Sequence, residues 1–303
     1  MIKLSVEVAS LTLRNPLMLA SGVLDESYES MKKIWNSGAG AVITKSIGKT
    51  ARAGYPNPVV VNEDGYLINA MGLPNPGIDD FINIIEKLNN EKIKVITSIF
   101  AENGDDFSYL AKKAEQYSTA IELNLSCPHA KGLGAEIGSN ADNVYDIVKS
   151  VKSSVKIPVW AKLTPNIADV SEIGIAAEEG GADAVVAINT VRAMAIDIKI
   201  KKPVLSNRYG GMSGKAIKPV GIAAVYKLYE SVKIPVIGVG GIESFEDVVE
   251  YMMAGACSVE IGTAIARFGV NLFNKILTEL QIYMKENEYD SPREMVGVAH
   301  ING

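Results

Sequence analysis

The stretch Val155-Lys-Ile-Pro-Val159 recurs unchanged as Val232-Lys-Ile-Pro-Val236, each time at the entry to an apolar run. A second repeat reads GAGAV at residues 38–42, GADAV at 181–185 and GACSV at 255–259. In each copy, small residues end a predicted helix and a β-branched residue begins a strand, because glycine readily adopts the left-handed backbone of a helix end. The chain is therefore built from repeated helix–strand units.

Reading outward from these repeats gives eight short apolar strands, expected near residues 17–22, 41–46, 95–100, 120–126, 159–164, 184–190, 236–240 and 258–262. Helices with apolar residues at helical spacing are expected between them, for example at residues 79–88, 105–117, 140–151 and 245–254. Continuous apolar strands that alternate with helices indicate a parallel sheet covered by helices. Eight such units favour a closed barrel over an open sheet. We therefore predict an α/β fold, a single (β/α)8 TIM barrel over residues 1–303, with residues 4–8 and 11–13 forming an N-terminal hairpin that plugs the barrel floor.

The composition excludes several classes of protein. The chain has 303 residues, of which 48% are hydrophobic, and a net charge of −5, so a nucleic-acid or anionic-membrane partner is not expected. Its two cysteines, Cys127 and Cys257, form no Cys-x-x-Cys motif, so we predict no metal or cluster site in this chain. Residues 1–10 do not resemble a signal peptide, and no apolar run reaches the ~20 residues that span a bilayer. A cytoplasmic protein without a membrane anchor is expected.

Polar residues or glycines stand at the carboxyl ends of all eight predicted strands, whereas the strand beginnings are apolar. The polar ends carry Ser21-Gly22, Lys45-Ser46, Ser98, Asn124, Lys162, Asn189-Thr190, Gly240-Gly241 and Gly262-Thr263. Barrel enzymes keep their active sites at this face, so the pattern predicts a ligand-binding rim. Two connections on the same face, residues 47–76 and 191–219, are too long for plain turns and are expected to be lids or binding loops.

Two lysines on barrel strands, Lys45 and Lys162, need an explanation because a lysine is rarely buried unless it is paired. Ion pairs with a carboxylate such as Glu122 would explain both. Ionisable groups in a pocket are often functional, and such pairing would not exclude contact with a ligand.

Glycines end two consecutive predicted strands, in Gly238-Val-Gly-Gly241 and Gly262-Thr263. Their backbone N–H groups can approach an anion closely at the start of a helix, which is the usual phosphate site of barrels. Either motif alone is weak, because glycine also serves tight turns. The pair predicts a phosphate-binding site.

The run Glu122-Leu-Asn-Leu-Ser-Cys-Pro128 places a thiol where a buried strand opens into a loop, and Pro128 ends the strand pairing. A lone cysteine is most often a packed core thiol, an interpretation that suits Cys257. A nucleophilic pair of Cys127 with His129 is disfavoured, because no third group is placed to orient the histidine. Cys127 is therefore a candidate for chemistry of another kind.

The chain resembles the dihydroorotate dehydrogenases over essentially its whole length. The matching pieces, in the family's order, are Thr44-Lys-Ser46, Arg52-Ala-Gly-Tyr-Pro-Asn-Pro58, Asn69-Ala-Met-Gly-Leu-Pro-Asn75, Asn124-Leu-Ser-Cys-Pro128, Asn189-Thr190, Gly210-Gly-Met-Ser-Gly-Lys-Ala-Ile-Lys-Pro219, Gly238-Val-Gly-Gly-Ile242 and Ile261-Gly-Thr263. Cysteine at position 127 resembles the class 1 enzymes, whereas the membrane-bound class uses a serine base. Residues 128–134 look more like the NAD-linked class 1B than the fumarate-using class 1A, which stays the alternative.

The resemblance implies FMN on the barrel rim and dihydroorotate above it. It assigns the FMN phosphate to Gly240, Gly241, Gly262 and Thr263, with backbone contacts from Gly214 and Ile188. It assigns the rest of the cofactor to Ser21, Lys45, Ser46, Ser98, Asn124 and Lys162. The substrate would meet Lys45 at its carboxylate and, around its ring, Asn69, Ala70, Met71, Gly72, Leu73, Asn124, Asn189 and Thr190. Cys127 would be the catalytic base that removes the C5 proton while hydride leaves C6 for FMN.

Class 1B further implies a partner subunit that carries FAD and a [2Fe-2S] cluster and passes electrons to NAD. A homodimeric core within a heterotetramer of two catalytic and two electron-transfer chains is the implied assembly, and pyrimidine biosynthesis the implied pathway. The sequence departs from the family at Ser98 and His129, where asparagine is common, and at Lys215, where proline is common. Another FMN-dependent barrel oxidoreductase acting on a related pyrimidine, or on a 2-hydroxy acid, is a second interpretation, and a non-enzymatic scaffold is a third.

Overall fold

The computed structural model describes residues 2–125 and 137–301, and its centre is a closed barrel of eight parallel strands. Around the barrel the strands are β3 (Leu17–Leu19), β4 (Ala41–Ile43), β7 (Val95–Ile99), β8 (Ala120–Asn124), β9 (Val159–Lys162), β10 (Ala184–Ala187), β15 (Val236–Val239) and β16 (Ala256–Ile261). The predicted TIM barrel and all eight of its strands are confirmed. Most strands end a few residues earlier than predicted, so several of the polar residues at their carboxyl ends lie in the loops of the rim, whereas Ser98, Asn124 and Lys162 stay within β7, β8 and β9.

Helices cover the outside of the barrel. They are α1 (Tyr28–Asn36), α2 (Ile78–Asn90), α3 (Gly104–Ala114), α4 (Ala141–Lys152), α5 (Val170–Glu179), α6 (Lys218–Ser231), α7 (Phe245–Met253), α8 (Thr263–Phe268), α9 (Leu272–Glu286) and α10 (Val298–Ile301). Their apolar faces meet the strands, as in α2, which buries Phe81, Ile85 and Leu88. Among the helices that the structure describes, none is long and apolar enough to cross a membrane.

The N-terminal hairpin closes the floor of the barrel, as predicted. It consists of β1 (Val6–Val8) and β2 (Leu11–Leu13). Val8 and Leu13 are fully buried in one apolar cluster with residues of the barrel interior such as Trp160. The lower part of the barrel is therefore a dry, packed core.

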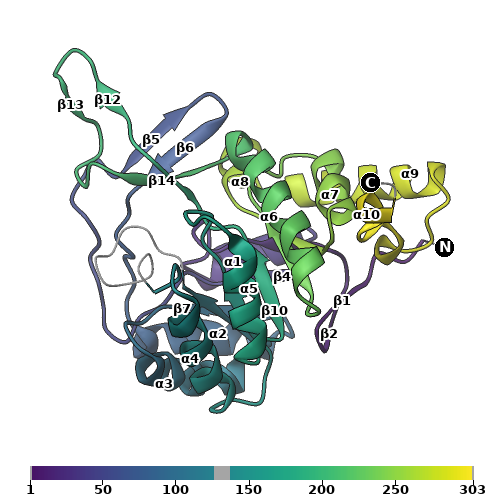
Figure 1. The fold of residues 1–303 in the computed structure, drawn as a ribbon, viewed down its shortest axis with the longest axis horizontal. Coiled ribbons are helices and arrows are strands. Elements are labelled where there is room, and N and C mark those ends of the chain that lie inside the picture. Colours follow the sequence, from purple (N-terminus) through teal and green to yellow (C-terminus); the bar gives the residue numbers. More distant parts are fainter. Residues whose placement is uncertain (1, 126–136, 302–303) are drawn as a thin grey trace.

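The two long connections are not plain loops but together form a second sheet. Residues 47–76 contain β5 (Val60–Glu63) and β6 (Tyr66–Asn69), and residues 191–219 contain β11 (Val191–Ala193), β12 (Ile196–Asp197), β13 (Lys202–Pro203) and β14 (Gly210–Ser213). Four of these strands pair in the antiparallel order β11-β14-β6-β5, with Asn69 of β6 opposite Gly211 of β14. Figure 1 shows this sheet on the opposite side of the molecule from the β1–β2 hairpin.

Candidate active site

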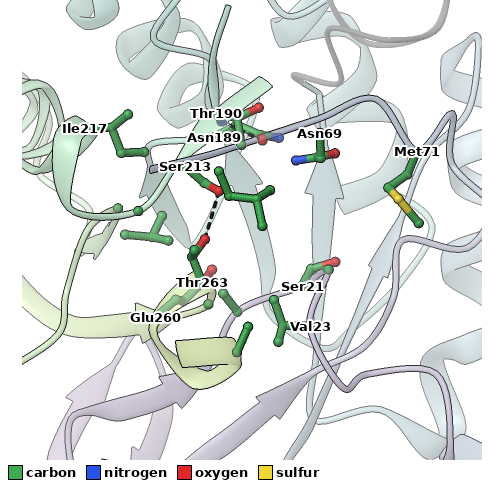
Figure 2. Close-up of a pocket in the computed structure, with 18 of the residues that line it drawn as sticks. Ser21, Val23, Asn69, Met71, Asn189, Thr190, Ser213, Ile217, Glu260 and Thr263 are labelled. Atoms are coloured by element: carbon green, nitrogen blue, oxygen red, sulfur yellow. Dashed lines mark hydrogen bonds between the residues drawn. The ribbon is translucent and has the colours of Figure 1, made fainter. Parts of the chain in front are cut away.

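A cavity of about 500 Å³ lies at the carboxyl ends of the barrel strands, beneath the β5–β6 hairpin and the end of β14 (Figure 2). This volume suits a small-molecule or cofactor site. The predicted site residues that line it are Ser21, Lys45, Ser46, Asn69, Met71, Gly72, Leu73, Asn124, Lys162, Ile188, Asn189, Thr190, Gly214, Gly240, Gly241, Gly262 and Thr263. The fold thus brings residues from all parts of the chain to one cavity. Cys127 lies outside the described residues.

Two predicted site residues, Ala70 and Ser98, do not line the cavity. Both side chains are fully buried. The Ser98 hydroxyl lies 3.0 Å from that of Ser46, which accepts a hydrogen bond from Asn124 Nδ2 at 2.9 Å. Asn124 Oδ1 accepts in turn from Asn189 Nδ2 at 3.3 Å. Ser98 therefore reaches the cavity only through Ser46 and the two amides.

A buried cation and two carboxylates form the floor of the cavity. Lys162 Nζ lies 2.6 Å from Glu260 Oε2 and 3.4 Å from Glu122 Oε2, and both glutamates have side chains that are 0% exposed. Burial alone would lower the pKa of Lys162, but the charges of Glu122 and Glu260 outweigh it, so its pKa is raised. The predicted pairing of Lys162 with Glu122 is confirmed. Glu260 was missed, although it is the lone charged residue of an apolar predicted strand.

Lys45 has a different partner from the predicted one. Its Nζ lies 2.6 Å from Glu26 Oε1 at the rim of the cavity, not beside Glu122. The Lys45 side chain is 11% exposed, whereas that of Glu26 is 68% exposed. A pair with such an exposed carboxylate contributes little stability, so the Lys45 ammonium can exchange Glu26 for an anionic ligand at small cost.

Three glycines bring separate loops into close contact on one wall of the cavity. Gly214, Gly240 and Gly241 have φ values of +95°, +127° and +68°. A Cβ atom on Gly241 would lie 2.8 Å from the Gly214 carbonyl oxygen and 3.0 Å from the backbone nitrogen of Lys218. Beside them, the Thr263 hydroxyl donates to Ser213 Oγ at 2.8 Å (Figure 2). Backbone without side chains, next to hydroxyl groups, is a surface that an anion such as phosphate can approach closely.

Asp247 ties these glycine loops together from behind. Its Oδ1 atom lies 2.6 Å from Lys215 Nζ and 2.9 Å from Lys218 Nζ, and its Oδ2 atom accepts from the backbone N–H groups of Glu243 and Ser244 at 2.8 and 3.1 Å. Burial raises the pKa of Asp247, but the hydrogen bonds from Lys215 and the Glu243 N–H outweigh this effect and lower it. Lys215, which stands where the family often has proline, therefore has a structural partner in Asp247.

These features define a class of protein: a TIM-barrel enzyme whose cavity joins a glycine-lined wall, a buried cation and a group of amides. The family model described as dihydroorotate dehydrogenase matches residues 3–284, and the chain belongs to this family. It is 50% identical to the "Dihydroorotate dehydrogenase B (NAD(+)), catalytic subunit" of Methanocaldococcus jannaschii, over 98% of both chains. It is 51% identical to the protein of that name from Thermoplasma volcanium, over 98% of both chains, and 49% identical to the one from Pyrococcus abyssi, over 98% of this chain and 99% of the relative.

Replacing Asp247 by Asn should destabilise the protein by about 3 kcal/mol at pH 7, because it breaks a buried network of charges. The folded-state pKa of Asp247 is lowered, so its contribution is present above the unfolded-state pKa of about 4 and is lost as pH falls through the folded value. The gap between wild type and Asp247→Asn in urea unfolding should therefore close as the pH falls below about 4. Glu250→Gln, which removes a half-exposed partner of Lys218, serves as the control and should cost under about 1 kcal/mol. An equal deficit at pH 3 and pH 7 would contradict this account.

Proposed function

We propose that this chain is the catalytic subunit of an NAD-linked dihydroorotate dehydrogenase, which binds FMN and oxidises (S)-dihydroorotate to orotate in pyrimidine biosynthesis. The observation that carries the proposal is the joining, in one cavity, of a glycine-lined wall, a buried lysine and three asparagine side chains. Relatives about 50% identical over nearly the full length carry that name, which favours this activity over other barrel oxidoreductases.

The described residues fit FMN at both of its ends. Gly214, Gly240, Gly241 and Gly262 would hold the phosphate, because their backbones carry no side chain and let an anion come close, and Thr263 would hold it beside them. At the other end, Lys162 is held by Glu122 and Glu260 and would stabilise negative charge on the ring. Bound FMN supplies the hydride acceptor. Ser21 and Ser46 also line the cavity, and their hydroxyl groups would meet the ribityl chain, while Ile188 would add a backbone contact.

The substrate would lie on the side of the cavity nearer the small sheet. Lys45 would bind its carboxylate in place of Glu26. The Asn69, Asn124 and Asn189 amides each offer a donor and an acceptor, which suits a ring with both kinds of group at its edge. The turn of Ala70, Met71, Gly72 and Leu73, together with Thr190, would enclose the ring and exclude water.

Cys127 is the proposed base, an assignment that rests on the sequence. It would take the C5 proton of dihydroorotate as hydride leaves C6. An ordinary thiol has a pKa near 8.5, so the rate of flavin reduction should increase with pH unless a neighbouring group lowers that value.

Electrons would leave through a partner subunit that carries FAD and a [2Fe-2S] cluster, because this sequence has only two cysteines and no cluster motif. The names of the relatives, with NAD and "catalytic subunit", support this route over the fumarate-linked class 1A alternative. A homodimeric core, two chains of each kind and a cytoplasmic location complete the proposal.

Co-purification of this chain with a cluster-bearing subunit would support the proposed assembly. Turnover of fumarate by the isolated chain, with no such subunit, would favour class 1A.

The purified protein should be yellow and should be bleached by dihydroorotate without oxygen. Cys127→Ala should keep its FMN but slow flavin reduction by about 10² to 10⁴, the usual contribution of a general base, as followed by stopped-flow absorbance. Cys257→Ala, the other cysteine of the sequence, is the control and should reduce at the wild-type rate. Normal reduction in Cys127→Ala would remove that residue from its role. Yellow protein that is not bleached would indicate another substrate, and protein that stays colourless with added FMN would refute the flavin site.

Gly241→Ala should weaken FMN binding at least tenfold, because the new methyl group would collide with backbone atoms of Gly214 and Lys218 that cannot move aside. Quenching of FMN fluorescence on titration into apoprotein measures the dissociation constant. Gly269→Ala is the matched control: its φ of +74° is as strained, yet a Cβ atom there meets nothing within 4 Å. Equal FMN affinities in the two variants would mean that backbone strain, and not the close contact, decides binding.

A further inference from the structure

The three charges at the cavity floor do not balance if all are ionised. Glu122, Lys162 and Glu260 would then carry a net charge of −1 in a part of the barrel where the carboxylates have no access to water. An excess charge in such a place is costly, and proteins commonly avoid it by binding a proton. The cluster therefore needs one more positive charge or one fewer negative charge.

The hydrogen bonds of the two glutamates point to a bound proton. Lys162 lies close to Glu260 Oε2, at 2.6 Å, but at 3.4 Å from Glu122 Oε2. The remaining oxygen of each carboxyl group, Glu122 Oε1 and Glu260 Oε1, is buried and has no hydrogen-bond partner among the residues that the structure describes. The two carboxyl groups are within hydrogen-bonding reach of each other, and burial, followed by the charge of Glu122, raises the pKa of Glu260 to about 8. A proton on either group would turn two facing acceptors into a donor and an acceptor.

The described residues around Glu260 are mostly apolar, so the proton would be held within the cluster itself. The residues paired with Glu260 on the strands either side of β16 are buried and apolar, Val239 of β15 and Met18 of β3. The charges that act on Glu260 are those of Glu122 on β8 and Lys162 on β9. Among the residues that the structure describes, the other titratable groups of these elements have other neighbours: Lys45 pairs with Glu26, Asp25 accepts from the Gly22 N–H, Cys257 packs against the floor cluster, and Tyr251 of α7 donates to the Gly240 carbonyl.

We propose that Glu122 and Glu260 share one proton, so that the Glu122–Lys162–Glu260 cluster is neutral at pH 7. Glu260 is then a positioning residue, because its protonation sets the net charge of the cluster that holds Lys162 beside the bound flavin. The second statement rests on the function proposed above, whereas the first does not. When pH rises through about 8, the shared proton leaves to solvent and the cluster becomes −1. A reduced flavin bound beside Lys162 would carry negative charge there, so reduction of the flavin would become less favourable above that pH.

Infrared spectroscopy of the apoprotein, with its glutamates labelled with ¹³C, tests the shared proton directly. At pH 6.5 the wild type should show the carbonyl band of a buried protonated glutamic acid, and the band should disappear as the pH rises through about 8. Glu260→Gln and Glu122→Gln should each lack it, because the remaining carboxylate then balances Lys162 without a proton. Glu286→Gln, at an exposed position of α9, should keep it. Absence of the band from the wild type, or its persistence in both cavity variants, would overturn the proposal.

The flavin midpoint potential tests the role of Glu260. Wild type and Glu260→Gln should have equal potentials at pH 6.5, where both clusters are neutral. At pH 9 the wild-type potential should fall below that of the variant, because only the wild-type cluster has become negative. A difference that is the same at both pH values would indicate a merely structural role and would overturn the assignment. Protein that binds no FMN would refute the proposed function instead and would leave the infrared result intact.

Discussion

The ion cluster of Lys162, Glu122 and Glu260 is the constraint on which the site depends. Closing eight strands into a cylinder turns every second side chain of each strand inward, so the interior must be filled. Below the cluster, apolar side chains and the N-terminal hairpin fill it. Above it, the cavity opens. The cluster is therefore the boundary between a packed core and a binding site, and it can stay there only because its charges satisfy one another.

Around this boundary, polar groups are arranged in two systems that serve opposite ends of the cavity. On one side, hydroxyl and amide groups run from Ser98 through Ser46 and Asn124 to Asn189. On the other, Asp247 and its two lysines hold the glycine loops. The first system orients groups that can recognise a polar ring, and the second keeps a surface of bare backbone in place. The first system is built from residues within and just after barrel strands, and the second from residues of α7, of the start of α6 and of the turn before it.

Much of this arrangement follows from local sequence, and the rest depends on contacts between distant residues. The eight strands, the floor hairpin and the glycine sites could be predicted, because apolar runs and glycines report on their immediate surroundings. The sheet formed by the two long connections could not, since Asn69 and Gly211 are 142 residues apart and the strands are short. The pairing of Lys45 with Glu26 and the place of Glu260 in the barrel were missed as well. Each requires knowing which side chains the folded loops and strands bring together.

The shared sheet has a consequence for how this enzyme can change. β6 ends at Asn69 and leads directly into the turn of residues 70–73. β14 ends at Ser213, beside Thr263, and the two strands are paired with each other. Neither connection can be lengthened, shortened or replaced without moving the wall that the other one provides. Loops grafted from a relative to alter specificity would have to be exchanged as a pair, so the two segments should be inherited together although they are far apart in the gene.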